Sequence, residues 1–321
     1  MHAVSEVAGT LPFPVLGRAV RRMAFGCEPL GGYNWGHVDN AAIEAAIETA
    51  LNDDPAKGAM IFDTADTYGP HLSEERLGRC LAGHRKGAVL ATKFGVRLSD
   101  GQAWYDTSPA YADQALDASL ARLGTDYIDL YQLHWPDDTT PLPETLNALE
   151  GFRAEGRIRA YGVSNVAPKD LLPLLGDFPG LASFSLGYSL LDREAEAGIS
   201  AVCGQGLVFL AYGCLSQGLL SGKYKADTVF EGQDRRNNPK YHNFHGDQLV
   251  RNLKIVDELK VEAKRLESPV PALALAFVLE QLPRAIPLVG IKSTEQLMQN
   301  LMALSIAVDQ NTLARLGKAS Q

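Results

Sequence analysis

The stretch Phe62-Asp63-Thr64-Ala65-Asp66-Thr67-Tyr68-Gly69 places two carboxylates and a phenol directly after the apolar run Ala-Met-Ile at 59–61. An apolar run that ends abruptly in ionisable groups indicates a buried strand that opens into a functional loop. Catalytic groups of a (β/α)8 barrel lie at this kind of position, where strands end and the loops to the following helices begin. We therefore asked whether the rest of the chain repeats the same unit.

Short apolar runs with strand character alternate along the chain with longer segments of helical spacing. Strands are expected at 23–26, 60–63, 88–93, 127–133, 158–163, 183–188, 207–212 and 285–289. Helices are expected at 39–51, with Asp39 as the N-cap, and at 73–82, 109–123, 143–155, 168–175 and 247–266. Strands covered by helices pair in parallel, so eight such units predict an α/β fold of the single (β/α)8 TIM-barrel type.

The main alternative is a doubly wound open sheet. That fold places a G-x-G-x-x-G phosphate turn after its first strand, and no predicted strand is followed by this motif. No composition break or proline-rich linker divides the 321 residues. We therefore expect one domain over residues 1–321, interrupted by a long loop at about 222–246.

Composition limits the partners. The chain is 46% hydrophobic and 21% charged, and its net charge of −8 argues against a nucleic-acid surface. No stretch has the length of a membrane span, and the N-terminus lacks the pattern of an export signal. The four cysteines form no C-x-x-C pair, so we expect neither a metal site nor a disulfide framework, and a cytoplasmic location. Small molecules are the expected partners.

Four ionisable side chains should meet at one mouth of the barrel, because successive strands are neighbours. Asp63 and Tyr68 follow the second predicted strand, Lys93 ends the third, and His134 follows the fourth. Lys93 is expected to stabilise the phenolate of Tyr68 and lower its pKa, while Asp63 holds Lys93 charged. Tyr68 then serves as an acid, and His134 donates a hydrogen bond to a substrate carbonyl. A carbonyl polarised in this way needs a hydride.

These motifs resemble those of the aldo-keto reductase family. The stretches FDTADTYG, SEERLG, ATKFG, SLARLGTDYIDLYQLHWPD, GRIRAYGVSN, YSLLDR, LAYGCLSQGLLSGKY and PLVGIKSTEQLMQNL follow the family's order over nearly the whole chain. The resemblance implies a barrel that binds NADPH or NADH and transfers hydride to a small aldehyde, ketone or sugar derivative. It also implies the catalytic tetrad Asp63, Tyr68, Lys93 and His134. The bacterial general-stress and sugar-modifying branches are the most similar.

The resemblance also implies a cofactor site. Ser164 and Asn165 match the pair that holds the nicotinamide carboxamide, and Tyr212 matches the aromatic residue that stacks on the ring. Ser185 stands where the family commonly has a longer amide. The remaining matches concern the pyrophosphate loop (Gly213, Leu215, Gln217) and the site for the adenosine and its 2′-phosphate (Gly290, Lys292, Ser293, Gln296, Asn300). Gln296 replaces an Arg of many members, which leaves NADH as an alternative to NADPH.

Several loop residues allow two interpretations. Trp35, Trp104 and Trp135 lie in loops predicted at the barrel mouth, where they suit ring stacking on a substrate or packing within their own loops. In the long loop, three cations suit either a lid that clamps the cofactor phosphates or a solvated surface: Arg235, Arg236 and Lys240.

Three functions stay open. The first is carbonyl reduction with Tyr68 as the general acid. The second is a NAD-dependent sugar or aldose 1-dehydrogenase that runs the same hydride step in reverse. The third is a regulatory subunit similar to potassium-channel β-subunits, which share the barrel and the tetrad. The sequence leaves the substrate, the reaction direction and the oligomeric state undecided.

Overall fold

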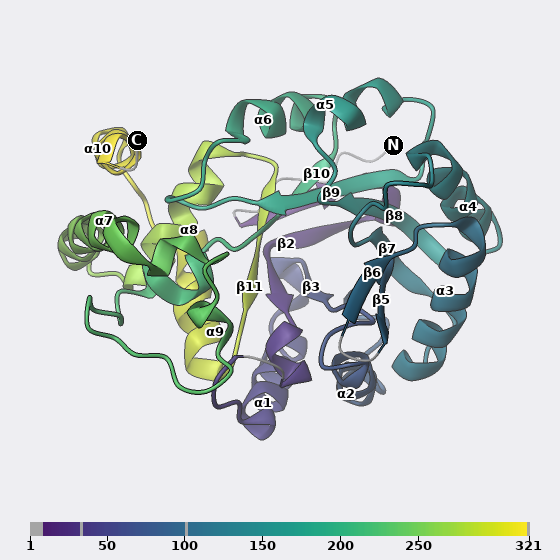
Figure 1. The fold of residues 1–321 in the computed structure, drawn as a ribbon, viewed down its shortest axis with the longest axis horizontal. Coiled ribbons are helices and arrows are strands. Elements are labelled where there is room, and N and C mark those ends of the chain that lie inside the picture. The colour runs from purple at the N-terminus through teal and green to yellow at the C-terminus, as the bar shows by residue number, and fades with distance from the viewer. Residues whose placement is uncertain (1–8, 33–34, 100–101, 320–321) are drawn as a thin grey trace.

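The computed structural model describes residues 9–32, 35–99 and 102–319, so the predictions for the extreme N-terminus lie outside the described residues. Eight strands of this part form a closed parallel barrel with helices around it (Figure 1). The pairing of β2 with both β3 and β11 closes the sheet. The prediction of a (β/α)8 TIM barrel is confirmed.

All eight predicted strands are present, with ends shifted by a few residues. They are β2 (Arg18–Gly26), β3 (Ala59–Asp63), β4 (Val89–Phe94), β7 (Ile128–Leu133), β8 (Ile158–Ser164), β9 (Leu181–Gly187), β10 (Val208–Tyr212) and β11 (Ala285–Gly290). Two strand pairs lie outside the predicted set. β1 (Thr10–Phe13) runs antiparallel to β2, and β5 (Val96–Ser99) forms a hairpin with β6 (Gln102–Tyr105).

The helices surround the barrel. They are α1 (Asn40–Leu51), α2 (Leu72–Leu81), α3 (Pro109–Leu123), α4 (Leu142–Ala154), α5 (Pro168–Leu171), α6 (Glu196–Gly204), α7 (Gly246–Arg265), α8 (Val270–Gln281), α9 (Thr294–Leu301) and α10 (Gln310–Ala319). Asp39 caps α1 as predicted, because its side chain accepts a hydrogen bond from the backbone N–H of Ala42. The described residues include no helix with both the length and the apolarity that a bilayer crossing requires.

The strands alternate between an interior and an exterior apolar layer. On β3, Ile61 belongs to the cluster inside the barrel, whereas Phe62 packs outward against the helices. The next side chain, Asp63, therefore faces inward again. The same alternation on β4 takes Ala91 and then Lys93 into the interior. Apolar residues thus fill the interior at the N-terminal ends of the strands, and the two ionisable groups form a layer at the C-terminal ends.

The N-terminal end of the barrel is closed by β1. Leu11 and Phe13 belong to the same interior cluster as Ile61 and Val20. Because apolar side chains close this end of the barrel, the entrance to the site is at the opposite end, where the strands terminate.

Ile61→Ala is expected to lower the free energy of unfolding by about 2–5 kcal/mol, because the removed methylenes leave a cavity between fully buried neighbours. Urea unfolding followed by circular dichroism measures the shift. The matched control is Val229→Ala, at a side chain that is 84% exposed, which should change stability by less than about 0.5 kcal/mol. Equal stability of the two variants would contradict the assignment of Ile61 to a packed interior layer.

Candidate active site

The structure brings together the four side chains that were predicted to converge. Asp63 is the last residue of β3, Lys93 lies near the end of β4, and His134 follows β7 directly. Tyr68 comes from the loop between β3 and α2, whose backbone folds back so that its hydroxyl reaches Lys93. All four therefore meet at the C-terminal end of the barrel strands.

Lys93 is the centre of this group. Its ammonium forms a short ion pair with the Asp63 carboxylate and donates a hydrogen bond of 2.8 Å to the carbonyl of Thr64. The Nζ atom also lies 3.3 Å from the Tyr68 hydroxyl. The second oxygen of Asp63 accepts a hydrogen bond of 3.1 Å from the Gln132 side-chain amide. Because Asp63 and Lys93 are buried, these bonds replace the water that both charges lose on folding.

The pKa of Tyr68 is raised well above the ordinary value for a tyrosine. Burial of the hydroxyl is the largest cause, and the negative charges of Glu28 and Asp63 add to it. The expectation of a lowered pKa for Tyr68 is therefore wrong for the protein alone, because burial and the two carboxylates outweigh the opposing positive charge of Arg235. Tyr68 is consequently protonated at neutral pH, which is the state required of a proton donor.

His134 is uncharged at neutral pH. Its pKa lies well below the ordinary value because of burial and of the positive charge on Lys93. The imidazole ring stands edge-on to the Tyr68 ring, with centroids 5.8 Å apart and an interplanar angle of 83°. Its buried Nδ1 has no hydrogen-bond partner within the described part of the chain. A neutral imidazole next to the phenol is suited to bind the oxygen of an uncharged carbonyl.

Two glycines fix the loop that carries Tyr68. A Cβ on Gly31 would lie 2.7 Å from the backbone nitrogen of Gly69 and 2.7 Å from the carbonyl carbon of Tyr68. Gly69 adopts a φ of +62°, and a Cβ there would lie 2.1 Å from the Gly31 oxygen. The loop after β2 thus rests on the backbone beside Tyr68. No sequence motif predicts this contact, because it joins two loops that are 38 residues apart in the chain.

The predicted nicotinamide pocket contains an unpaired buried hydroxyl. Ser164 Oγ is buried and has no hydrogen-bond partner among the described residues, so it is available to a ligand. Asn165 has a φ of +61°. Its side-chain amide donates a hydrogen bond of 2.8 Å to the His134 carbonyl and accepts one of 2.6 Å from the Tyr212 hydroxyl, so both of its ends are used within the protein. The hydroxyl of Ser185 donates 2.7 Å to the carbonyl of Leu210, which leaves it able only to accept from a carboxamide.

The predicted pyrophosphate loop follows β10 and is held in left-handed backbone. Gly213, Ser216, Gln217 and Gly218 have φ values of +69°, +43°, +51° and +93°. Successive turns of this kind direct backbone N–H groups to one side and form concave sites for anions. Leu215 lies within this loop, between Gly213 and Ser216, and is partly buried against the core. The sequence had indicated the loop but not its conformation.

The predicted adenosine site lies after β11. Gly290 ends this strand, Ser293 caps α9 by accepting from the backbone N–H of Gln296 at 3.2 Å, and Asn300 is buried on the same helix. The Gln296 side chain accepts 3.0 Å from the backbone N–H of Lys292. Gln296 therefore stabilises the loop that presents Lys292.

Lys292 lies in a cluster of positive charge. Burial lowers its pKa, and the charges of Arg236 and Lys223 lower it further, whereas the carboxylate of Asp234, which pairs with Arg236, acts in the opposite direction. Its Nζ donates 2.6 Å to the carbonyl of Trp35. A phosphate bound here would relieve the repulsion between these cations, so the residues fit the phosphorylated end of a nicotinamide cofactor.

The segment 222–245 packs against the loop after β2. Arg235 forms a 2.6 Å ion pair with Glu28, and its guanidinium lies 4.3 Å from the centroid of the Trp35 ring. The Nζ of Lys292 lies 6.0 Å from the same centroid. Trp35, which was predicted to bind substrate, is thus placed between cations on the side of the adenosine site. Lys240 is exposed, in agreement with the solvated interpretation for that residue.

The other two tryptophans lie on the side of His134. Trp135, next to His134, is 41% exposed, and its ring centroid is 6.2 Å from that of Tyr105. Trp104 on β6 is 42% exposed and lies 5.4 Å from the guanidinium carbon of Arg97. Tyr105 and Trp135 thus form an exposed aromatic pair, whereas Trp104, which neighbours Tyr105 on β6, points to the opposite face of the hairpin. Within residues 9–32, 35–99 and 102–319, His, Cys, Asp and Glu side chains form no group of three that suits a metal ion.

Comparisons with known proteins agree with this geometry. The sequence model of the Aldo/keto reductase family matches residues 22–321. The NADH-specific methylglyoxal reductase of Escherichia coli is 31% identical over 92% of this chain and 93% of its own. The structure of a glycerol dehydrogenase from Gluconobacter oxydans has a TM-score of 0.87 at 31% identity, covering 98% and 95% of the two chains. An aldo/keto reductase from Klebsiella pneumoniae, solved with NADP and acetate, has a TM-score of 0.70 at 28% identity, covering 97% and 95%.

Gly31→Ala is expected to lower kcat by about ten- to a hundredfold, because the new methyl group displaces the backbone beside Tyr68 by a fraction of an ångström to an ångström. Steady-state kinetics with a reactive aldehyde measures the loss. Gly151→Ala is the control, since a Cβ at that helical position meets no atom within 4 Å. A kcat equal to that of the wild type would show that the Gly31 contact does not position Tyr68.

Proposed function

The chain belongs to the aldo-keto reductase family and is an NAD(P)-dependent oxidoreductase, and from this premise we propose that Tyr68 protonates the carbonyl oxygen of its substrate. The observation that supports the proposal most directly is the Lys93 ammonium, placed between the Asp63 carboxylate and the Tyr68 hydroxyl at the barrel mouth. The proposed substrate is a small aldehyde, ketone or sugar derivative.

The protein supplies the proton and its control, and the bound nicotinamide supplies the hydride. Tyr68 carries the proton at its hydroxyl in the resting state, because its pKa is raised. When the proton leaves, negative charge develops on the phenolic oxygen, 3.3 Å from the Lys93 ammonium. Lys93 thus stabilises the product of proton transfer. Its hydrogen bonds to Asp63 and Thr64 hold it in place throughout.

His134 is proposed to orient the carbonyl. A charged imidazolium would compete with Tyr68 as a proton donor, and the lowered pKa of His134 removes that competition. As a neutral ring it binds the carbonyl oxygen through one N–H and places it beside the phenol. The bond from the Asn165 amide to the His134 backbone carbonyl fixes the start of this loop.

For the cofactor, the proposed contacts follow from the groups that the fold leaves available. Ser164 offers an unpaired hydroxyl for the carboxamide, and Tyr212 presents its ring at the end of β10. The left-handed turn at 213–218 suits the diphosphate. The positive cluster around Lys292 favours NADPH over NADH, because a 2′-phosphate would neutralise charges that repel one another.

A second candidate is the reverse reaction, oxidation of a polyol or sugar hydroxyl. It is favoured by the similarity to the protein titled a glycerol dehydrogenase from Gluconobacter oxydans. The exposed aromatic pair of Tyr105 and Trp135, next to His134, suits the apolar face of a sugar as well as an aromatic aldehyde. We also propose a cytoplasmic location, which the free thiols of Cys27, Cys80, Cys203 and Cys214 support.

Tyr68→Phe is expected to lower kcat for carbonyl reduction by about 10²- to 10⁴-fold, since it removes the proposed proton donor together with its 3.3 Å contact to Lys93. The Kd for NADPH, measured by fluorescence titration, should stay within about twofold, because the phenol does not belong to the proposed cofactor contacts. Tyr131→Phe is the matched control, because it removes a buried hydroxyl that bonds the Ala112 carbonyl outside the mouth. Turnover of Tyr68→Phe at the level of this control would refute the assignment of the general acid.

Lys292→Met is expected to weaken NADPH binding by about ten- to a hundredfold, which corresponds to the loss of one charge-assisted contact to phosphate. NADH, which lacks the 2′-phosphate, should bind about as well as to the wild type. Parallel titrations with the two cofactors measure the selectivity, with Lys240→Met as the control at an exposed lysine of the segment 222–245. Equal losses for both cofactors would assign Lys292 a structural role instead.

A further inference from the structure

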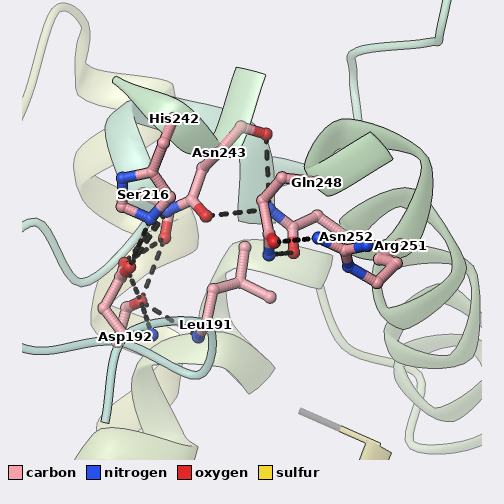
Figure 2. A network of polar contacts seen from close by, with 9 residues as sticks. Leu191, Asp192, Ser216, His242, Asn243, Gln248, Arg251 and Asn252 are labelled. Atoms are coloured by element: carbon pink, nitrogen blue, oxygen red, sulfur yellow. Dashed lines mark hydrogen bonds and ion pairs between the residues drawn. The ribbon is translucent and has the colours of Figure 1, made fainter. Parts of the chain in front are cut away.

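A partly buried polar network links the proposed cofactor loop to the end of the segment 222–245 (Figure 2). The loop needs such support, because Ser216 and Gln217 adopt φ values of +43° and +51°. A side chain with a Cβ disfavours this region, and residues stay there only where neighbouring groups hold them. Ser216 is fully buried, so its hydroxyl depends on the protein for partners.

The carboxylate of Asp192 supplies this support. Asp192 follows β9, and one of its oxygens accepts from Ser216 Oγ at 3.3 Å and from Ser189 Oγ at 2.9 Å. The two hydroxyl oxygens lie 3.0 Å apart, so the three groups form a closed triangle. Reciprocal backbone hydrogen bonds between Ser189 and Asp192, at 3.1 and 3.3 Å, fix the turn that presents the carboxylate.

The same carboxylate also holds the end of the segment 222–245. The amide of Asn243 donates to both Asp192 oxygens, at 3.1 and 3.2 Å, and Asn243 is buried. Its own carbonyl oxygen accepts 2.8 Å from the Asn252 amide on α7, which prevents the Asn243 amide from turning. His242 lies at the edge of the network, with Nε2 3.6 Å from Asp192.

We infer that Asp192 is a positioning residue for the cofactor, which ties the left-handed turn at 213–218 to the chain that carries Arg235 and Arg236. This inference rests on the proposed function. On this inference, a bound dinucleotide leaves when the segment 222–245 separates from the loop after β2, where Arg235 pairs with Glu28, and the Asp192 network resists that motion at one end of the segment. Its loss should therefore speed cofactor release without removing a group from the tetrad.

The test compares NADPH dissociation from the wild type, Asp192→Ala and Asp192→Asn by stopped-flow fluorescence. Asp192→Ala should release NADPH about tenfold faster or more, because it breaks bonds to both segments, and the shape-conserving Asp192→Asn should restore most of the slow release. The weaker binding of NADPH by Asp192→Ala should raise the KM for NADPH, and kcat should not fall. The control Asp53→Ala removes a carboxylate of similar exposure, 27% against 31%, that bonds Arg21 far along the strand from the mouth, and its release rate should match the wild type.

Ser216→Ala provides a second test that does not depend on the folding of Asp192→Ala. If Asp192 acts through Ser216, this variant also speeds release, and the double variant adds less than the product of the two effects. Wild-type release rates in both variants would overturn the inference. A fold-decrease in kcat as large as the fold-increase in the KM for NADPH would also overturn it. Failure of the wild-type protein to bind NADPH or NADH would overturn the proposed function instead, so the two results are distinguishable.

Discussion

The alternation of side chains along parallel strands is the constraint on which this site depends. An interior position of a closed barrel has no access to bulk water, so any polar group placed there must find its partners among its neighbours. On β3 and β4 the inward-facing residues are apolar until the C-terminal end of each strand, where Asp63 and Lys93 introduce charge. These two groups form an ion pair, and Gln132 from the next strand donates a hydrogen bond to Asp63, so each buried charge has partners. The Asp63–Lys93 ion pair thus also covers the end of the hydrophobic interior.

The loops add what the strands alone cannot provide. Tyr68 is not on a strand, and its position depends on the close backbone crossing of Gly31 and Gly69. Glu28, on the same loop as Gly31, raises the pKa of Tyr68 and pairs with Arg235 from the segment 222–245. One carboxylate, that of Glu28, therefore influences both the pKa of Tyr68 and the contact that holds the segment 222–245. Movement of the segment would alter the charge balance around Tyr68 as well as access to the site.

The sequence predicted the barrel and the meeting of Asp63, Tyr68, Lys93 and His134, because both follow from strand order and from where each strand ends. It did not predict the direction of the pKa shift of Tyr68. That shift depends on how much water the fold removes and on Glu28, which is 40 residues away in the chain. It left open whether Trp35 stacks on a substrate or packs within its own loop, because an aromatic side chain in a mouth loop has no periodic pattern that reveals which side it faces. The β5–β6 hairpin was missed for a similar reason, since polar residues interrupt its short strands.

The two ends of the site are stabilised by different kinds of interaction, and this difference has a functional consequence. The tetrad is held by a buried ion pair on barrel strands, which open only with the core itself. The proposed cofactor turn is held by side-chain hydrogen bonds between loops, at Asp192, Ser216 and Asn243, and such contacts break with local motion alone. A dinucleotide must enter and leave many times while the catalytic groups stay in register. Exchange therefore leaves the Asp63–Lys93 ion pair in place, whereas the Glu28–Arg235 contact, whose charges act on Tyr68, changes with the position of the segment 222–245.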